Sequence, residues 1–207
     1  MKPADVVDAI ANALSNLKSP GVGLRGFESI VLKYLGVPIG SIGLGRAAAE
    51  KMFLREGERL LYLAQDVDEW ILEQRVHVRR VPGMEECSCH WSMEQLVEHN
   101  ITTGVGIART LQRLLKSSIP ECDVNVVNAN PVGGRRAEIR TALQDFLHRF
   151  SSEFSGVHFL RTRHAMHPSF GKLNAEQWFR LAAVNNLVHR VHGERIFERL
   201  LHTDLTQ

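Results

Sequence analysis

The chain has 207 residues, of which 44% are hydrophobic, a length and composition typical of one globular domain with or without an extension. Its formal net charge of only +2 excludes the strong positive field of a typical nucleic-acid or anionic-membrane binder, so we expect neither partner. No stretch reaches the roughly 18 apolar residues of a transmembrane helix, and three cysteines cannot all pair, which favours a cytoplasmic location.

The first part of the chain predicts an N-terminal helical extension. Apolar residues recur every four positions over residues 3–17, which is typical of a short amphipathic helix. Glycine- and proline-containing stretches then flank a short helical segment near residues 26–35. We therefore divide the chain into an extension, 1–44, and a helical domain, 45–207.

Hydrophobic periodicity within that domain predicts four long helices, at 45–74, 92–117, 134–151 and 174–201. Two of them have a capping sequence at their start, because Ser92 precedes Gln95 by three residues and Asn174 precedes Gln177 by three. The last link contains VHFLRT, 157–162, which we expect to be extended. Four long helices with long links predict an all-α four-helix bundle.

Polar residues interrupt the apolar stripe of the last predicted helix. Steps of three and four residues from Trp178 pass through Asn185, His189 and His192 before the stripe becomes apolar again. Buried polar groups are costly unless they are satisfied. These three side chains therefore either hydrogen-bond within the core or bind a ligand, and imidazole suits Zn, Ni, Cu and Fe.

The second predicted helix offers a matching residue. His99 lies at the edge of its apolar stripe, and metal sites in helical bundles draw their ligands from facing helices. His99 and His189, completed by His192 or Asn185, could form such a site. The alternative hypothesis is a set of core histidines that are satisfied by hydrogen bonds.

Three segments resemble the DinB-like family of four-helix-bundle metalloenzymes. They are WSMEQLVEH (91–99), HPSFGKLNAEQW (167–178) and VNNLVHRVHGERI (184–196). The family pattern has Trp-Ser before its second helix, a histidine two turns later, a His-Pro-x-Phe-Gly turn, and two histidines four residues apart on its last helix. The resemblance covers roughly residues 45–200.

The resemblance implies an up-down-down-up bundle with three histidines around a divalent metal, Zn or Ni, and an open coordination position. It places the first ligand on His99, the last on His189 and the middle one on Asn185. Asparagine departs from the family pattern, because its neutral amide oxygen is a poor ligand for soft metals. Three outcomes follow: Asn185 ligates weakly, His192 replaces it, or the site holds no metal.

The implied activity is metal-dependent chemistry of the hydrolase or thiol S-transferase type on a small-molecule substrate. No separate catalytic acid or base stands out in the sequence. The alternative function is a metal-free bundle that acts as a small-molecule binder or a dimeric interaction module, in which Asn185 and the histidines fix helix register. In either case we expect a homodimer, because twofold assembly is the commonest oligomeric state.

Three further groups of polar residues receive structural interpretations. His167, in the turn before the last helix, is expected to pack on that helix. Cys87, Cys89 and His90 are expected to form a surface loop with two thiols rather than a zinc site, because structural zinc needs four ligands. The basic residues between 75 and 80 are interpreted as a solvated helix end.

Overall fold

The computed structural model describes residues 44–81, 84, 86–116, 131–134, 136–159, 162–167 and 170–204. The extension predicted over 1–44, with its two helical segments, lies outside the described residues except for Leu44, which is buried. Within the described part the fold is mostly helical, with one two-stranded sheet, so the predicted all-α class is confirmed. The elements are α4 (Arg46–Gln65), α5 (Glu69–Leu72), η2 (Glu86–His90), α6 (Met93–Leu115), α7 (Arg136–Phe154), β1 (His164–His167), β2 (Gly171–Asn174) and α8 (Ala175–Asp204).

Both predicted capping sequences begin helices. At α6, the Gln95 amide donates to Ser92 Oγ and the Ser92 amide donates to Gln95 Oε1, each over 3.2 Å. At α8, the same reciprocal pair joins Asn174 and Gln177 over 2.9 and 3.0 Å. These bonds satisfy amide groups that have no partner within the first helical turn, and so fix where each helix starts.

The first predicted helix, 45–74, is in fact two helices. The chain leaves α4 at Gln65 and resumes helical structure only at Glu69. Arg140 of α7 donates to the carbonyl oxygens of Ala64 and Val67, over 2.9 and 2.5 Å. A side chain distant in sequence thus satisfies carbonyl groups at this helix end, which periodicity alone could not indicate.

The extended segment predicted at 157–162 is also displaced. Residues 157–159 have no regular structure, and the strands are instead β1 and β2, which pair antiparallel with His164 opposite Asn174 and His167 opposite Gly171. Gly171 has a φ of 73°, a left-handed conformation that favours glycine and closes the hairpin. The hairpin runs directly into α8.

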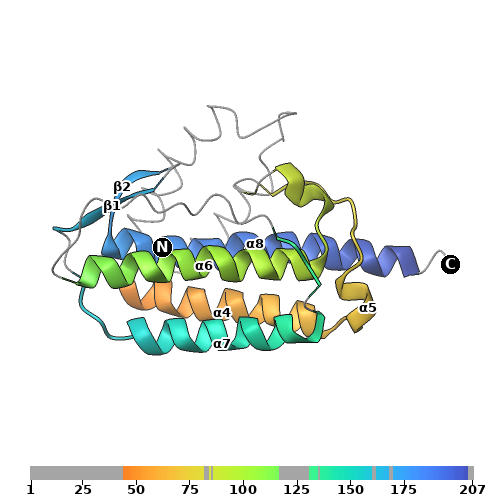
Figure 1. Cartoon of the computed structure of the whole chain (residues 1–207), viewed down its shortest axis with the longest axis horizontal. Coiled ribbons are helices and arrows are strands. Elements are labelled where there is room, and N and C mark those ends of the chain that lie inside the picture. The colour runs from red at the N-terminus through yellow and green to blue at the C-terminus, as the bar shows by residue number, and fades with distance from the viewer. Residues whose placement is uncertain are drawn as a thin grey trace.

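The four long helices lie side by side, with the hairpin at one end and α5 at the other (Figure 1). Helix α8 packs most extensively on α4 and α6, and α7 completes the group by packing on the same two helices. The hydrophobic core lies between them and includes the stacked rings of Phe53 and Phe150, whose centroids are 4.2 Å apart. Close approach requires glycine at two points: a Cβ at Gly57 or Gly104 would lie within 2.3 Å of a side chain of α7.

Paired contacts show how the helices run. Asn186 and Arg190 of α8 contact Phe53 and Glu56 of α4 in the same order, so these two helices run in the same direction. Helices α6 and α8 run in opposite directions, because His99 meets His189 while the next residue, Asn100, meets Asn185. Gln112 of α6 bonds Glu153 near the C-terminal end of α7, and these two helices run in the same direction (Figure 1).

A buried ion pair joins α4 to α8. Glu56 is fully buried, and its Oε2 accepts from Arg190 Nε over 2.8 Å, while Arg55 contacts the other oxygen at 2.5 Å. Arg190 also pairs with the half-exposed Glu194 over 2.6 Å. Burial lowers the pKa of Arg190, but the two carboxylates outweigh it and the pKa is raised, so the guanidinium stays charged.

Glu56→Gln should lower the free energy of unfolding by about 3 kcal/mol, because Arg190 then keeps a buried charge without its full partner. Glu194→Gln, the matched control on the same arginine, should cost less than about 1 kcal/mol, since that carboxylate is partly solvated. Urea denaturation of both variants measures the difference. Equal losses would show that burial of Glu56 adds nothing to this pair.

Candidate functional site

The structure brings His99 of α6 and His189 of α8 together. Their ring centroids are 5.3 Å apart and their planes are inclined by only 25°. Both side chains are buried, with 8% and 3% of their surface exposed. Antiparallel packing of the two helices produces this contact between residues 90 positions apart, and it was the pair that the two amphipathic stripes suggested.

His189 is held in one tautomer. Its Nδ1 lies 2.8 Å from the backbone oxygen of Asn185. Because a carbonyl oxygen can only accept, Nδ1 must carry the hydrogen, which leaves a lone pair on Nε2. That Nε2 is buried and has no hydrogen-bond partner. Histidines that ligate metals are oriented in the same way, with the other ring nitrogen bonded to a carbonyl or carboxylate.

The lowered pKa of His189 corresponds to a neutral ring at physiological pH. The pKa of His189 is lowered to about 3, mainly by burial and less by the neighbouring His99 and His192, against an opposing effect of the hydrogen bond to the Asn185 carbonyl. A neutral imidazole with a buried lone pair can ligate a metal.

Asn185 belongs to a polar contact one turn away. Its Nδ2 donates to Asn100 Oδ1 over 2.7 Å, and Asn100 is completely buried with no partner for its own Nδ2. This bond occupies the amide nitrogen of Asn185 but leaves its Oδ1 outside the contact. The residue therefore lies on the same seam as the two histidines and takes part in joining α6 to α8.

His192 is directed to a different element. Its Nε2 donates to the backbone oxygen of Ser88 in η2 over 2.9 Å, and the residue is completely buried. Its Nδ1 has no partner, and burial lowers its pKa to about 4. The imidazole thus attaches η2 to α8, and its unpartnered nitrogen is Nδ1, whereas that of His189 is Nε2.

The contact between α6 and α8 brings together the imidazoles of His99 and His189. Across the described residues, no three His, Cys, Asp or Glu side chains are grouped so as to hold a metal ion. The separation of the two ring centroids is nevertheless close to that expected around a shared ion. Rings bound at a Zn–N distance of about 2.1 Å and a tetrahedral angle have centres roughly 5 Å apart, close to the 5.3 Å between His99 and His189.

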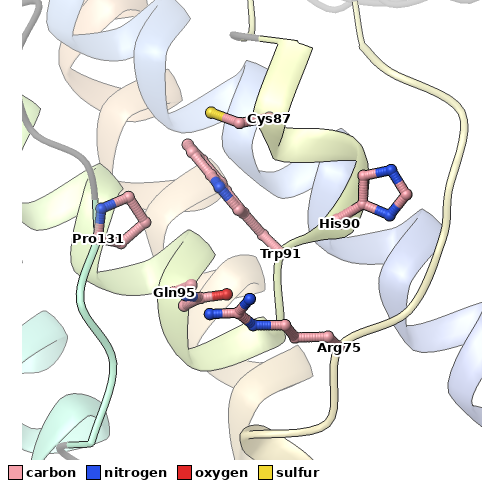
Figure 2. Close-up of a pocket in the computed structure, with 6 residues that line it drawn as sticks. All are labelled: Arg75, Cys87, His90, Trp91, Gln95 and Pro131. Carbon is pink, nitrogen blue, oxygen red and sulfur yellow. The ribbon is translucent and has the colours of Figure 1, made fainter.

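A pocket of about 370 Å³ lies beside the pair. Figure 2 shows its lining residues, which are Arg75, Cys87, His90, Trp91, Gln95 and Pro131. Trp91 connects the two features, because its ring lines the pocket and also packs against His99 with centroids 4.8 Å apart. The indole of Trp91 therefore contacts both the pocket and the His99 ring.

Sequence reasoning missed most of this pocket. Arg75 was assigned to a solvated helix end, whereas it lies on an irregular stretch between α5 and η2 and lines the pocket. Arg80, from the same group, is 7% exposed and donates to the Met84 carbonyl oxygen. The only signal for the pocket was Trp91, which precedes the α6 capping sequence in the segment that carries the family resemblance.

The cysteines lie in a turn, as expected, although Cys87 and His90 also line the pocket, and His167 packs on α8 as expected. Cys87 and Cys89 lie in the η2 turn outside any disulfide, and Cys87 is exposed. His167 accepts the Phe170 amide at Nδ1 over 3.2 Å and packs on Trp178 at the start of α8. Burial lowers its pKa to about 4. Neither group takes part in the histidine pair.

Comparisons with known proteins do not place the chain. No family model matches it, and no curated protein or solved structure matches it significantly. None of the helices in the described ranges is long and apolar enough to cross a membrane. Function must therefore be inferred from the geometry of the site and from the resemblance of the three sequence segments.

The buried histidines predict loss of stability in mild acid. The pKa of His192 in the folded protein, about 4, is below its ordinary value of 6.5, so the unfolded chain binds more protons between these values. The free energy of unfolding should therefore fall as the pH drops below 6.5, by up to about 1.4 kcal/mol per pH unit for each such histidine.

His192→Gln should make this fall shallower by about 1 kcal/mol per pH unit between pH 6.5 and 5, because glutamine cannot take up a proton. His148→Gln, on an exposed position of α7, is the control and should keep the wild-type slope. Urea titrations at several pH values give the slopes. An unchanged slope in His192→Gln would mean that the His192 ring is not held neutral.

Proposed function

We propose that the chain is an up-down-down-up four-helix bundle of the DinB-like kind that binds a divalent metal, Zn or Ni, between α6 and α8. His99 and His189 are its protein ligands. The metal serves hydrolase or thiol S-transferase chemistry on a small-molecule substrate in the adjacent pocket. A homodimer and a cytoplasmic location stay predictions from sequence.

The helix directions support the bundle. Helices α4 and α8 run one way, and α6 and α7 run the other way, in the chain order that the resemblance implies. The polar seam on α8 faces α6, the helix that carries His99. The two helices that carry the candidate ligands in the family are thus the two that meet here.

The observation that carries the proposal is the unpartnered Nε2 of His189. A buried polar atom without a partner costs about 1–3 kcal/mol, yet the Asn185 carbonyl fixes the tautomer that leaves this lone pair unpaired. A second imidazole lies beside it. A bound cation would satisfy the lone pair and repay that cost.

A divalent ion held by the pair would polarise a substrate oxygen or lower the pKa of a bound water or thiol. The chain's own residues orient and shield the site. The Asn185 carbonyl keeps the His189 ring in place, and Trp91 covers one side of His99. Two protein imidazoles leave several coordination positions open, for the Asn185 oxygen, for water or for substrate.

A metal-free binder is the second candidate, and the Asn100–Asn185 bond favours it. That bond occupies the amide nitrogen at the position where the family resemblance expects a third histidine. Asn185, Asn100 and the histidines would then act as register-fixing residues of the seam. In this case the pocket beside Trp91 would bind its ligand without metal chemistry.

Metal binding separates the two candidates. The test must account for His77 and His90, a second imidazole pair, because their centroids are 4.8 Å apart and both side chains are exposed. The titration therefore uses His77→Ala as the parent protein. We expect it to bind about one Zn²⁺ or Ni²⁺ per chain by calorimetry and elemental analysis.

Adding His189→Ala or His99→Ala to that parent should weaken the binding at least about tenfold, since each removes one of two ligands. Adding His148→Ala, an exposed histidine on α7, should not change it. Circular dichroism verifies that each variant is folded. A parent protein that binds no metal, or folded His99 and His189 variants that bind it unchanged, would favour the metal-free candidate.

A further inference from the structure

The pocket beside the histidine pair has one fixed charge. Of its six lining residues, Arg75 is the only one that is always charged, and no aspartate or glutamate lines the wall. The remaining lining surface is mostly apolar or neutral. Its volume of about 370 Å³ suits a small organic molecule rather than a macromolecule.

Arg75 is available to a ligand. It is exposed, and in the described part of the chain it has no ion-pair or hydrogen-bond partner. Figure 2 shows its guanidinium directed toward Gln95, along the side of the pocket that also holds Trp91. The planar guanidinium carries two parallel N–H groups, a geometry that matches a carboxylate better than a neutral amide or a point anion.

Trp91 and Pro131 provide flat apolar walls. Trp91 is 5% exposed and its indole packs on His99, and Pro131 lies to one side of the indole (Figure 2). The segment that contains Pro131 is anchored to α6, because the Gly133 amide donates to Glu98 Oε2 over 2.8 Å. Apolar rings in the pocket lining favour a flat apolar ligand body.

We propose that this pocket binds small planar acids, in which a carboxylate meets Arg75 and an aromatic or other flat apolar body lies between Trp91 and Pro131. That the bound acid is the substrate of the site rests on the proposed function. The binding of acids by the pocket does not. The carboxylate of Glu98 would repel an acid. It accepts a hydrogen bond from the Gly133 amide, however, and Glu98 does not line the pocket.

The probe is benzoate, and the neutral isostere benzamide is its matched control, because the two differ mainly in charge. Binding to the full chain is followed by the indole N–H resonances of its three tryptophans. The Trp91 signal, assigned with Trp91→Phe, should shift with each ligand. The Trp70 and Trp178 signals act as internal references. We expect benzoate to bind about tenfold more tightly than benzamide.

Arg75→Gln should reduce that ratio to about one, whereas Arg109→Gln, an exposed arginine on α6, should leave it unchanged. A second readout is the rate at which iodoacetamide alkylates Cys87, measured by peptide mass spectrometry, because that thiol lines the same pocket. Benzoate should slow this reaction in the wild-type protein and in Arg109→Gln, but not in Arg75→Gln.

The outcomes separate this inference from the metal proposal. Equal binding of the two probes, no binding of either, or a benzoate preference that survives Arg75→Gln would overturn the inference, even if the histidine pair binds metal. An Arg75-dependent benzoate preference in a protein that binds no metal would support the inference and leave the metal-free candidate standing.

Discussion

The register of α8 is the constraint on which the rest of the structure depends. Polar side chains attach this helix to both of its neighbours: Asn186 and Arg190 reach α4, and Asn185 reaches Asn100 of α6. A slip of one residue would rotate the helix surface by about 100° and break all of these contacts at once. Apolar packing alone would tolerate such a slip far better, because it is not directional.

That register also assembles the candidate site. With Asn185 bonded to Asn100, the next turn brings His189 against His99. One turn later, His192 holds Ser88, so η2 with its pocket residues is attached to the same helix. Helix α8 therefore contacts both the His99 ring and η2, and a change in its register would disturb both contacts together.

The seam is costly for stability, which is a reason to expect that it serves function. The described residues leave Asn100 Nδ2, His189 Nε2 and His192 Nδ1 buried without partners. Leucine at these positions would avoid the cost of burying unsatisfied polar atoms. The two proposals explain different polar residues of the seam. In the metal-binding proposal the ion satisfies the His189 lone pair, and in the metal-free proposal the polar residues fix the register of the helices.

The sequence by itself determined the helical class, three of the four long helices within a few residues, and the caps at Ser92 and Asn174. These features depend on local periodicity and on contacts three residues apart. It also indicated that His99 and His189 face a common interior. The tertiary structure alone decided the break after Gln65, where Arg140 satisfies carbonyl groups, and the use of Arg75 in a pocket. Both depend on contacts between elements distant in sequence, which leave no periodic signal in the chain.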